Sequence, residues 1–459
     1  MITLTVNGKE RRLPGETDLL DYLKSLDIDA RLVAVAYNGE VVPRKHYGEV
    51  RLRQGDTVEI VRMVGGGEEL RRSKLDARAS NVEPQGLVRD RQSVDVIIVG
   101  GGVIGCTIAY YLSKGGASVA VVERGEVGGE ASGAAAGMLV PPAAALPGGP
   151  LRDLCLASLG AFPSLVGSLQ QETGVDVQFL TAGILVVAET EEQGQGLRQI
   201  VGRRELGLFG FEWLEGEPLR LLEPGLSPAL PGAAYSPGQH HVNPGHLTQA
   251  LARAAAARGA ELHQGTAVKG LLTRGGRVMG VRTGAGTIPA DNVVLAAGPW
   301  TGVLARRLGV NVPTRPMRGQ MLAYRSSLVR NMISGTEGYL VPKAGGFLFA
   351  GATVEDVGFR RRTTKRALAG LRRMARTLVP SLRQAPVVDA WAGLRPGSPD
   401  GLPILGPVPG VEGLWVATGH FRNGILLAPV TGELMARSIL KGRAVPELAP
   451  FSPSRFAAG

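Results

Sequence analysis

The first residues of the chain alternate between apolar and polar side chains, as a strand with one buried face does. Residues 2–6 follow this alternation, and Asn7-Gly8 is a strong signal for a two-residue hairpin turn. The strand-like pattern resumes at residues 10–13, so the beginning of the chain predicts two antiparallel strands.

A helix and further strands are predicted after this hairpin. Thr17-Asp18 can cap a helix that reaches Leu26, because leucines and a tyrosine recur there at roughly helical spacing. Strand-like runs follow at residues 33–37, 38–42 and 57–61. This order of elements predicts a ubiquitin-like β-grasp roll that spans residues 1–66.

The segment after this roll has a different character. Residues 67–93 are rich in charge and contain no aromatic side chain, which predicts a flexible linker. Residues 94–459 form the large remaining part, in which no internal repeat of useful length is evident.

A buried strand, a glycine turn and an apolar helix open the large part. Residues 94–99 are nearly all apolar and β-branched, which is typical of a strand in the middle of a parallel sheet. A G-x-G-x-x-G pattern follows, with Gly100, Gly102 and Gly105. Gly100 permits the tight turn, Gly102 lets the backbone approach a pyrophosphate, and Gly105 lets the helix pack against the strand. The helix N-terminus offers N–H groups and a positive dipole end to the phosphates.

An acidic residue after the second strand supports a dinucleotide site. Residues 118–122 form that strand, and Glu123 follows it, 18 residues past Gly105. A carboxylate there can accept hydrogen bonds from both ribose hydroxyls, and it disfavours a 2′-phosphate. An ordinary glycine turn would lack this context, so the whole pattern predicts dinucleotide binding.

The segments that follow favour FAD over a nicotinamide cofactor. A nicotinamide-binding domain would continue with βα repeats after Glu123, whereas residues 130–139 are mostly small and suit either a surface loop or close approach to a bulky ligand. Residues 291–300 form another buried strand that ends in small residues, and it predicts a return to the nucleotide-binding domain. Such a long insertion within the domain is common among flavoproteins.

Composition excludes several classes of protein. With 44% hydrophobic and 20% charged residues among 459, the chain is not disordered throughout. Its net charge of +11 is spread out, and the densest basic groups, at 360–362 and 365–373, have no interleaved aromatics, so nucleic-acid binding is not expected. No uncharged apolar stretch reaches the ~18 residues of a membrane span. Only Cys106 and Cys155 are present, which excludes a disulfide framework and, without a signal peptide, predicts a cytoplasmic protein.

Several stretches of the large part resemble the glycine oxidases, within the D-amino-acid-oxidase family of FAD enzymes. The resemblance covers about residues 94–450, and its most specific stretches are LAAGPWTG, GYLVPK, WAGLRPGSPDGLPILGP and GHFRNGILLAPVTG. It implies an α/β Rossmann-type FAD-binding domain with an inserted, mainly antiparallel substrate domain. The nucleotide-binding segments are then expected at about residues 94–145, 235–310 and 390–440.

The resemblance also implies a reaction. Glycine loses a hydride from its α-carbon to noncovalently bound FAD, and O2 reoxidises the flavin with release of H2O2. The imine is hydrolysed to glyoxylate and ammonia or used for thiazole synthesis. An oxidase for sarcosine or small D-amino acids, with the N-terminal roll as a docking module, is the alternative. A homo-oligomer, by family resemblance a tetramer, is expected.

Three residues are candidates for the substrate site. Arg395 lies in an apolar, proline-bounded stretch, where its guanidinium fork can hold an α-carboxylate through two hydrogen bonds, although a surface arginine is possible. Tyr339 can donate its hydroxyl to the same carboxylate or be a core tyrosine. Arg422 matches a family residue that lines the substrate site.

The resemblance assigns further residues to the cofactor. The glycine-rich stretch contributes Ser132, Ala136, Gly137 and Met138, Val268 matches a position whose backbone binds adenine, and the C-terminal motif contributes His420, Asn423, Gly424 and Ile425. Residues 419–427 are expected to enter a helix whose first amides stabilise negative charge on the reduced flavin. His420 is about as well explained as a structural histidine. His240 and His241 have no clustered acidic or cysteine partner, so no metal site is expected.

Residues 1–66 resemble the bacterial thiamine sulfur-carrier proteins. Residues 42–44, residues 55–60 and the glycines Gly65-Gly66 carry this resemblance. It implies two protein partners, a sulfur-carrier activating enzyme and thiazole synthase. The carrier chemistry needs a C-terminal carboxylate, yet Gly67 follows Gly66 here. Either cleavage exposes the tail, or the unit only docks the oxidase to its partners.

Overall fold

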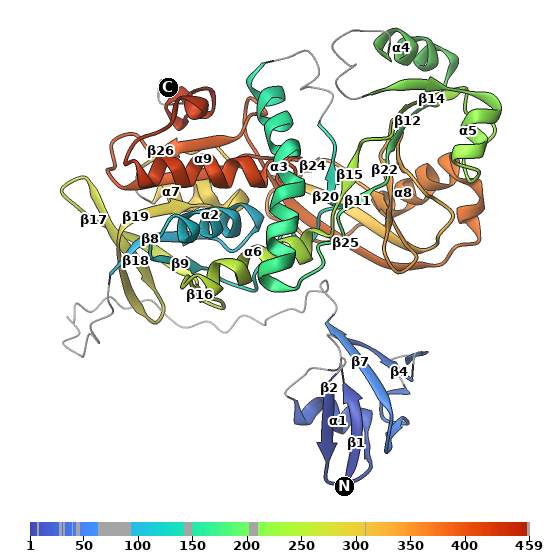
Figure 1. Ribbon diagram of the computed structural model, residues 1–459, viewed down its shortest axis with the longest axis horizontal. Coiled ribbons are helices and arrows are strands. Elements are labelled where there is room, and N and C mark those ends of the chain that lie inside the picture. Colours follow the sequence, from blue (N-terminus) through green and yellow to red (C-terminus); the bar gives the residue numbers. More distant parts are fainter. Residues whose placement is uncertain are drawn as a thin grey trace. The chain divides into compact units, whose positions relative to one another are not determined.

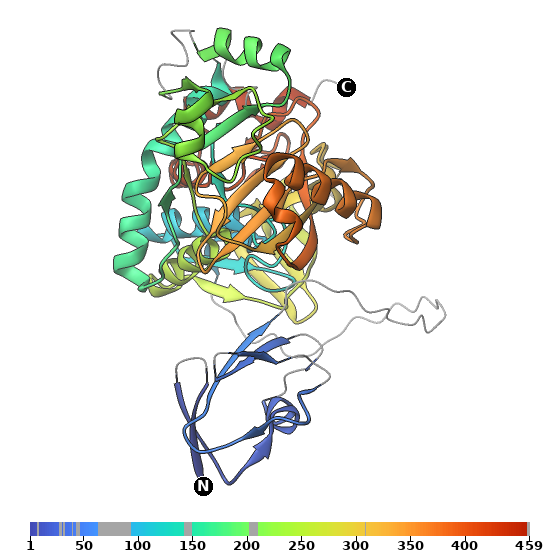
Figure 2. The same cartoon turned by 90° about the vertical axis from the view of Figure 1, so that its right-hand side faces the viewer.

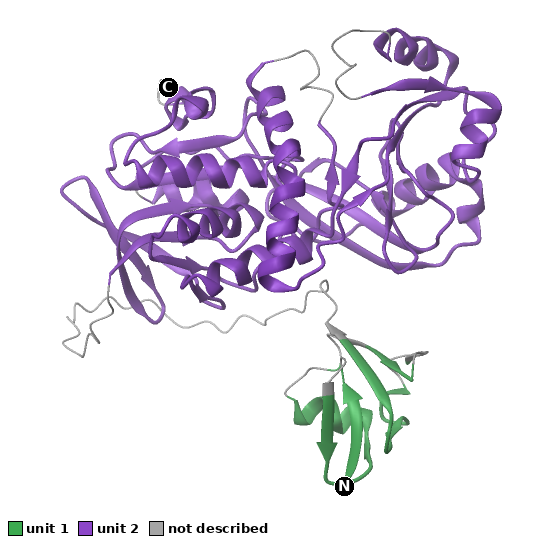
Figure 3. Cartoon of the chain, in the orientation of Figure 1, with its two compact units in different colours: residues 1–82 green, residues 83–459 purple. Residues whose placement is uncertain are grey.

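The computed structural model describes residues 1–6, 9–26, 30, 33–38, 40–42, 46–62, 93–141, 149–201, 210–307 and 309–456 (Figure 1). The chain divides into two compact units, residues 1–82 and 83–459, which are described separately (Figure 3). The predicted turn at Asn7-Gly8, the Gly65-Gly66 tail and residues 67–92 of the predicted linker lie outside the described residues.

The first unit is a mixed five-stranded sheet with one helix against it. The strand order is β2-β1-β7-β4-β5, and β1 and β7 run parallel at its centre. The strands are β1 (Ile2–Val6), β2 (Lys9–Leu13), β4 (Val33–Tyr37), β5 (Glu40–Val42) and β7 (Thr57–Arg62), and β3 (Thr17–Asp18) pairs separately with β6 (Arg51–Leu52). The predicted β-grasp roll is confirmed by this order.

Helix α1 (Leu19–Ser25) begins where the sequence predicts it. The Asp18 carboxylate accepts a hydrogen bond from the N–H of Asp21 at 2.7 Å and caps the helix. Leu19 and Leu23 are fully buried against Leu4 and Val58 of the sheet. The first unit therefore has its own hydrophobic core.

The first sheet of the second unit is built on parallel strands. Its parallel part has the order β16-β9-β8-β19-β27, and antiparallel β26, β18 and β17 complete it. The bounds are β8 (Val94–Val99), β9 (Val119–Val122), β16 (Glu261–His263), β17 (Val268–Arg274), β18 (Arg277–Thr283), β19 (Gly286–Leu295), β26 (Ile404–Pro407) and β27 (Leu414–Thr418). Three distant stretches of the chain thus form a Rossmann-type sheet, as predicted.

Helices cover one face of this sheet. Figure 1 shows α2 (Val103–Lys114) beside α6 (Pro244–Ala257) and α9 (Ala428–Leu440), with α3 (Pro150–Thr173) running across them. Ile98 of β8, Ile108 of α2 and Leu251 of α6 are fully buried in the core between sheet and helices. The parallel strands are buried on both faces, which explains their continuous apolar sequence.

The second sheet has nine strands and is mainly antiparallel. Its order is β13-β14-β12-β21-β22-β23-β20-β24, and β25 pairs with β20. The bounds are β12 (Ile184–Ala188), β13 (Glu212–Leu214), β14 (Gly232–Ser236), β20 (Arg315–Arg325), β21 (Met332–Ser334), β22 (Tyr339–Lys343), β23 (Phe347–Gly351), β24 (Glu355–Asp356) and β25 (Val387–Gly397). Figure 2 shows α8 (Lys365–Leu378) across this sheet, where Leu371 and Leu378 are buried. The predicted, mainly antiparallel second sheet is confirmed.

The remaining elements lie between and beyond the two sheets. Helices α4 (Glu191–Val201) and α5 (Gly216–Leu222) accompany β12 to β14, and α7 (Thr301–Arg306) follows β19. Three short strands, β10 (Met138–Leu139), β15 (His240–His241) and β11 (Leu180–Thr181), form a separate sheet. Within the described residues, no helix has both the length and the apolarity needed to cross a bilayer.

The structure differs from the sequence prediction at one domain segment. The third nucleotide-binding segment is expected from about residue 390, but β25 pairs along its length with β20 in the nine-stranded sheet. The first strand of that segment in the Rossmann-type sheet is β26, which begins at Ile404. Strand β25 therefore belongs to the nine-stranded sheet and not to the Rossmann-type sheet.

Candidate active site

An elongated cavity of about 800 Å³ connects the two sheets of the second unit. Val99 and Glu123 line it at the carboxyl ends of β8 and β9, and Met321 of β20 lines it from the nine-stranded sheet. The carboxyl ends of parallel strands are where open α/β sheets bind their ligands. Residues predicted for cofactor and for substrate therefore share one cavity.

The lining includes all but one of the residues predicted for the substrate and the cofactor. These are Gly100, Gly102, Glu123, Ser132, Ala136, Gly137, Met138, Val268, Tyr339, Arg395, His420, Arg422, Asn423, Gly424 and Ile425. Gly105 lies behind the turn instead. A Cβ at Gly105 would approach the Gly100 carbonyl oxygen to 2.0 Å, so this glycine lets helix and strand pack closely.

Gly100 and Gly102 of the turn are glycines for different reasons. Gly100 has φ +117°, and a Cβ there would lie 2.5 Å from the Ala296 carbonyl oxygen. Gly102 has an ordinary extended backbone, with φ −76° and ψ 175°, and a Cβ there would meet only the Ser132 hydroxyl, at 3.2 Å. The protein itself therefore leaves room for a side chain at Gly102. The missing side chain keeps cavity space free for a ligand.

The groups around this turn fit the phosphates and ribose of a dinucleotide. Helix α2 begins at Val103, after an N-cap glycine that has no side chain to cap it, so the positive end of the helix dipole faces the cavity. Ser132 accepts a hydrogen bond from the N–H of Val103 at 2.9 Å. The two carboxylate oxygens of Glu123 accept from the N–H groups of Gly101 and Gly125, each at 2.8 Å. Each oxygen keeps a second acceptor site for a ribose hydroxyl.

The C-terminal motif reaches the cavity as a turn. Residues 421–427 do not form a regular helix, and α9 begins at Ala428, later than the expected helix entry over residues 419–427. The N–H of Asn423 donates to the His420 carbonyl at 2.9 Å, which closes the turn. Gly424 and Ile425 line the cavity just before the helix. Helix α9 begins later than expected because backbone groups of this turn form hydrogen bonds with one another.

His420 is a buried histidine with a structural hydrogen bond, and it also lines the cavity. Its side chain is buried, lines the cavity, and makes a hydrogen bond of 3.1 Å between Nε2 and the Thr431 hydroxyl. Burial lowers the pKa of His420 to about 3, so the ring is neutral at physiological pH. The ring therefore supports the turn and contributes no charge to the cavity.

Arg395 and Tyr339 lie close together at the end of the cavity that the nine-stranded sheet lines. Arg395 donates from Nη1 to the Thr353 carbonyl at 3.0 Å, and its guanidinium lies close enough to the Tyr339 hydroxyl for each group to shift the pKa of the other. Burial raises the pKa of Tyr339, so the phenol stays protonated, and burial lowers the pKa of Arg395. Arginine has five N–H donors, and these contacts leave several of them for a ligand.

Arg422 joins this pair from the C-terminal motif. It is exposed at the cavity, and its charge acts on both Tyr339 and Arg395. The preceding Phe421 has a left-handed backbone, φ +48°, and its N–H donates to the Pro396 carbonyl at 2.8 Å. This bond ties the Arg422 turn to strand β25. The three predicted substrate residues are therefore brought together.

Two residues of this site were not predicted from the sequence. Gly319 of β20 and Thr353, just after β23, both contact Arg395. A glycine inside a strand signals close approach of another group, so the sequence offered a usable signal at Gly319. The sequence offered no such signal at Thr353, because its contact with Arg395 is made by a backbone carbonyl.

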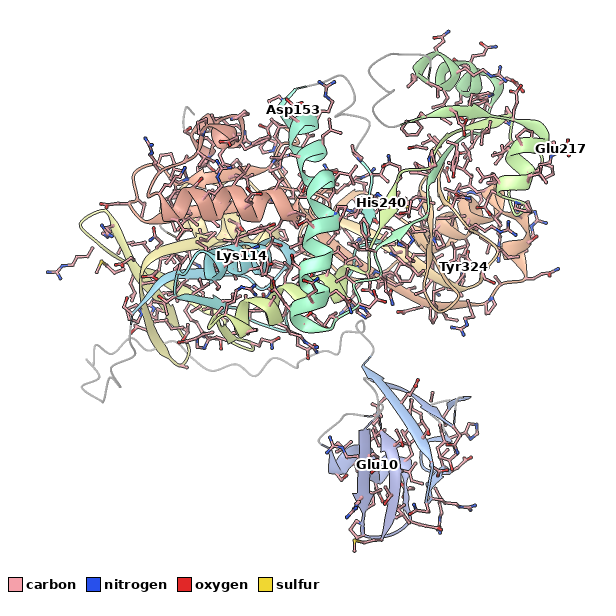
Figure 4. The ribbon with its side chains drawn as sticks, in the orientation of Figure 1. Glu10, Lys114, Asp153, Glu217, His240 and Tyr324 are labelled. Carbon is pink, nitrogen blue, oxygen red and sulfur yellow. The ribbon has the colours of Figure 1, made fainter. Side chains whose placement is uncertain are left out.

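His240 and His241 lie outside the cavity lining. Figure 4 labels His240, whose ring lies tilted against that of Phe179 with 4.7 Å between the ring centroids. His241 has its Nδ1 3.4 Å from the ammonium of Lys343, and that ammonium donates to the Val242 carbonyl at 2.8 Å. Burial, aided by Lys343, lowers the pKa of His241 to about 3. Within the described ranges no group of three or more potential metal ligands is found.

Lys343 should make the stability of the protein depend on pH. Burial lowers its pKa from an ordinary 10.5 to about 7, so between these values the unfolded chain binds the extra proton. Stability due to this group therefore rises with pH across that window, by at most about 1.4 kcal/mol per pH unit. Lys343→Met should flatten this rise, as measured by unfolding between pH 7 and 10. An unchanged slope would mean that Lys343 is charged in the folded protein.

Comparison with known proteins matches both units. Residues 95–438 match the family model described as FAD dependent oxidoreductase, and residues 4–67 match the ThiS family. A glycine oxidase of Geobacillus kaustophilus is 40% identical over 368 residues, covering 79% of this chain and 97% of that protein. A "Bifunctional protein ThiO/ThiG" of a Nostoc species is 36% identical over 367 residues, covering 79% of this chain and 55% of that protein.

A solved structure agrees with these sequence matches. The crystal structure of glycine oxidase from Geobacillus kaustophilus is similar with a TM-score of 0.75 and 37% identity, covering 80% of this chain and 99% of that one. The family match at residues 95–438 lies within the second unit. The chain therefore belongs to the FAD-dependent oxidoreductase family, with glycine oxidases among its relatives, and carries a ThiS-family unit at residues 4–67.

Proposed function

We propose that the second unit is a glycine oxidase that binds FAD noncovalently. The observation that carries this proposal is a single cavity with a dinucleotide turn at one end and the Arg395–Tyr339 pair at the other. Cys106 and Cys155 are buried outside the cavity lining, and burial raises the pKa of each thiol to about 12. Neither thiol is therefore suited to link a flavin covalently.

In this proposal Arg395 holds the α-carboxylate of the substrate. Its free N–H donors form a planar fork that matches the two oxygens, and burial strengthens the charge-assisted bonds. Tyr339, which stays protonated, donates to the same carboxylate. Arg422 adds positive charge at the exposed side of the pocket. The chemistry that FAD supplies when bound is acceptance of a hydride from the α-carbon and reoxidation by O2.

Tyr339 and His420 are poor proton acceptors. The raised pKa of Tyr339 keeps its hydroxyl protonated, and His420, with a pKa of about 3, is a weak base whose Nε2 already contacts Thr431. The substrate amino group is therefore expected to lose its proton to solvent before oxidation. The pocket binds and orients the neutral amine.

The activity can be tested on the purified protein. Glycine, O2 and water should give glyoxylate, ammonia and H2O2 in equal amounts. Rates with glycine, sarcosine and D-alanine distinguish the proposal from the alternative, an oxidase for sarcosine or small D-amino acids. A much higher kcat/KM for sarcosine or D-alanine than for glycine would favour that alternative.

The proposal for the first unit is a sulfur carrier for thiazole assembly. Its β-grasp sheet and its match to the ThiS family support this role, as does the "ThiO/ThiG" name of one relative of the second unit. Its partners would be a sulfur-carrier activating enzyme and thiazole synthase, which would use the imine made by the oxidase. We also propose a homo-tetramer in the cytoplasm, from the family resemblance.

The carrier role predicts a dependence on cleavage. A chain ending at Gly66 should accept sulfur from an activating enzyme, ATP and a sulfur donor, and gain ~16 Da as oxygen is replaced by sulfur. The intact chain should not react, because Gly66 is followed by a peptide bond. Mass spectrometry of the intact polypeptide measures both results.

A matched variant tests the shape of the tail. Gly66→Ala in the shortened chain should react poorly, because a methyl group restricts the backbone and widens a tail that must enter a narrow active site. If the shortened chain never gains sulfur with a competent enzyme, the first unit is a docking module only. The oxidase proposal would be unaffected, because its residues lie in the second unit.

A further inference from the structure

We infer that Thr353 and Gly319 are positioning residues that hold the Arg395 guanidinium in its carboxylate-binding orientation. This role rests on the proposed function of the second unit. Neither residue has to touch the substrate: Thr353 acts through its carbonyl, and Gly319 acts through the side chain that it lacks. The argument starts from the strand beneath the arginine.

The Arg395 guanidinium lies in the space that a side chain at position 319 would occupy. Strands β20 and β25 pair Met317 with Arg395 and Gly319 with Gly393, so position 319 is a diagonal neighbour of Arg395. A Cβ at Gly319 would lie 2.3–2.5 Å from Nη2, Nη1 and Cζ of Arg395. The guanidinium therefore lies directly on the backbone of β20, and this contact accounts for a glycine inside the strand.

Thr353 holds the guanidinium from a second direction. Its carbonyl accepts a hydrogen bond from Nη1 of Arg395 at 3.0 Å. Its hydroxyl accepts from the N–H of Gln320 at 3.0 Å and donates to the Glu355 carboxylate at 2.6 Å. Because Gln320 follows Gly319 in β20, one threonine fixes both the carbonyl and the strand that contact the arginine.

A buried polar network keeps Thr353 in place. Glu355 accepts a hydrogen bond from the Gln320 amide at 2.7 Å and forms an ion pair of 2.5 Å with Arg318. The side chains of Gln320 and Arg318 are buried. Burial alone would raise the pKa of Glu355, but hydrogen bonds from Arg318, Thr353 and Gln320 lower it overall. The carboxylate is therefore ionised, and its hydrogen bonds with Arg318, Gln320 and Thr353 restrict the movement of this network.

The position of Thr353 should let it affect binding of the substrate carboxylate without affecting the other steps of the reaction. Thr353 is absent from the cavity lining, and its hydroxyl reaches the site only through its own carbonyl and through Gln320. Loss of the hydroxyl should therefore loosen Arg395 without touching the cofactor end. The expected signature is a higher KM for glycine with little change in kcat and unchanged FAD content.

Thr353→Val tests this in the full-length holoenzyme. It keeps the shape of the side chain and removes its two hydrogen bonds, so the KM for glycine and the Kd for acetate should rise about 5- to 30-fold. Acetate carries a carboxylate but no oxidisable amine, and its binding can be followed by the flavin absorbance. Thr353→Ser, which keeps the hydroxyl, should restore most of the affinity.

Thr283→Val is the matched control. Thr283 is also nearly buried, and its hydroxyl donates to the Gly286 carbonyl at 2.9 Å and accepts from the N–H of Ala285 at 3.1 Å. It lies in the β18–β19 hairpin, outside the cavity lining. Its loss should lower thermal stability and leave the KM for glycine and the Kd for acetate unchanged.

Gly319→Ala provides an independent second test. Because its methyl group would overlap the guanidinium, the KM for glycine should rise at least about 30-fold. Gly270→Ala in β17, where a Cβ would meet only the end of Arg282 at 3.4 Å, is the control with unchanged KM. The inference is overturned if Thr353→Val and Gly319→Ala, each with FAD bound, keep wild-type affinity for both glycine and acetate. A protein that binds acetate through these residues but does not oxidise glycine would contradict the proposed function alone.

Discussion

Replacing Arg395 by alanine is expected to raise the KM for glycine roughly 30- to several-thousand-fold while FAD stays bound. The guanidinium lies at the substrate end of the cavity, beside Tyr339, and can hold a carboxylate through two parallel bonds. Its removal leaves the substrate carboxylate without that charge-assisted contact. Steady-state kinetics together with the FAD content of the purified variant measure both parts of the prediction.

Arg395→Lys sharpens the same experiment. An ammonium keeps the charge but lacks the planar fork, so only part of the lost affinity should return. Arg277→Ala is a matched control, because Arg277 pairs with Glu412 on the surface, away from the cavity lining. Unchanged kinetics in Arg395→Ala would assign the carboxylate to another residue, and Arg422 would be examined next.

Gly102→Val is expected to give a folded protein that binds FAD at least about 100-fold more weakly. The backbone at Gly102 suits any residue, and the surrounding protein leaves space for a side chain apart from the Ser132 hydroxyl. The new side chain would instead occupy the pyrophosphate space. Titration of the apo-protein with FAD, followed by flavin fluorescence, measures the loss, and thermal unfolding of the apo-protein checks the fold.

Gly105→Ala separates cofactor space from protein packing. Its Cβ would strike the Gly100 carbonyl whether or not FAD is bound, so the apo-protein itself should lose stability.

Acid denaturation of the wild-type protein should release all of its FAD to the supernatant. Flavin that stays with the denatured polypeptide would contradict noncovalent binding, and a Gly102→Val protein with normal FAD affinity would move the pyrophosphate away from this turn.

Local sequence patterns were sufficient for the nucleotide half of the site. Gly100, Gly102, Gly105 and Glu123 occur within one strand–helix–strand unit, so their geometry follows from short-range rules. The order of the β-grasp strands was likewise readable from alternation and turn signals. These features depend on neighbours in sequence, which a single chain displays directly.

The substrate half required information that lies in strand register. Gly319 and Arg395 are distant in sequence and meet because β20 pairs with β25, and no local pattern states that pairing. The same pairing is why residues from about 390 lie in the nine-stranded sheet. The start of α9 at Ala428 also escaped prediction, because turn bonds after His420 compete with helical ones. Family resemblance supplied Arg395 and Tyr339, whereas Thr353 needed three-dimensional contacts.

The way in which distant stretches share the Rossmann-type sheet has a consequence for synthesis of the chain. β8 has β19 as one neighbour, and β19 in turn pairs with β27, which ends at Thr418. The central strands therefore stay incomplete until most of the polypeptide has left the ribosome, and contacts of such long range form slowly. The strand pairings described in the first unit all lie within residues 2–62, so this unit can fold long before. Nascent chains should thus pass through a stage in which a finished β-grasp roll precedes an oxidase with exposed apolar strand edges, the stage at which chaperones and early FAD supply would matter most.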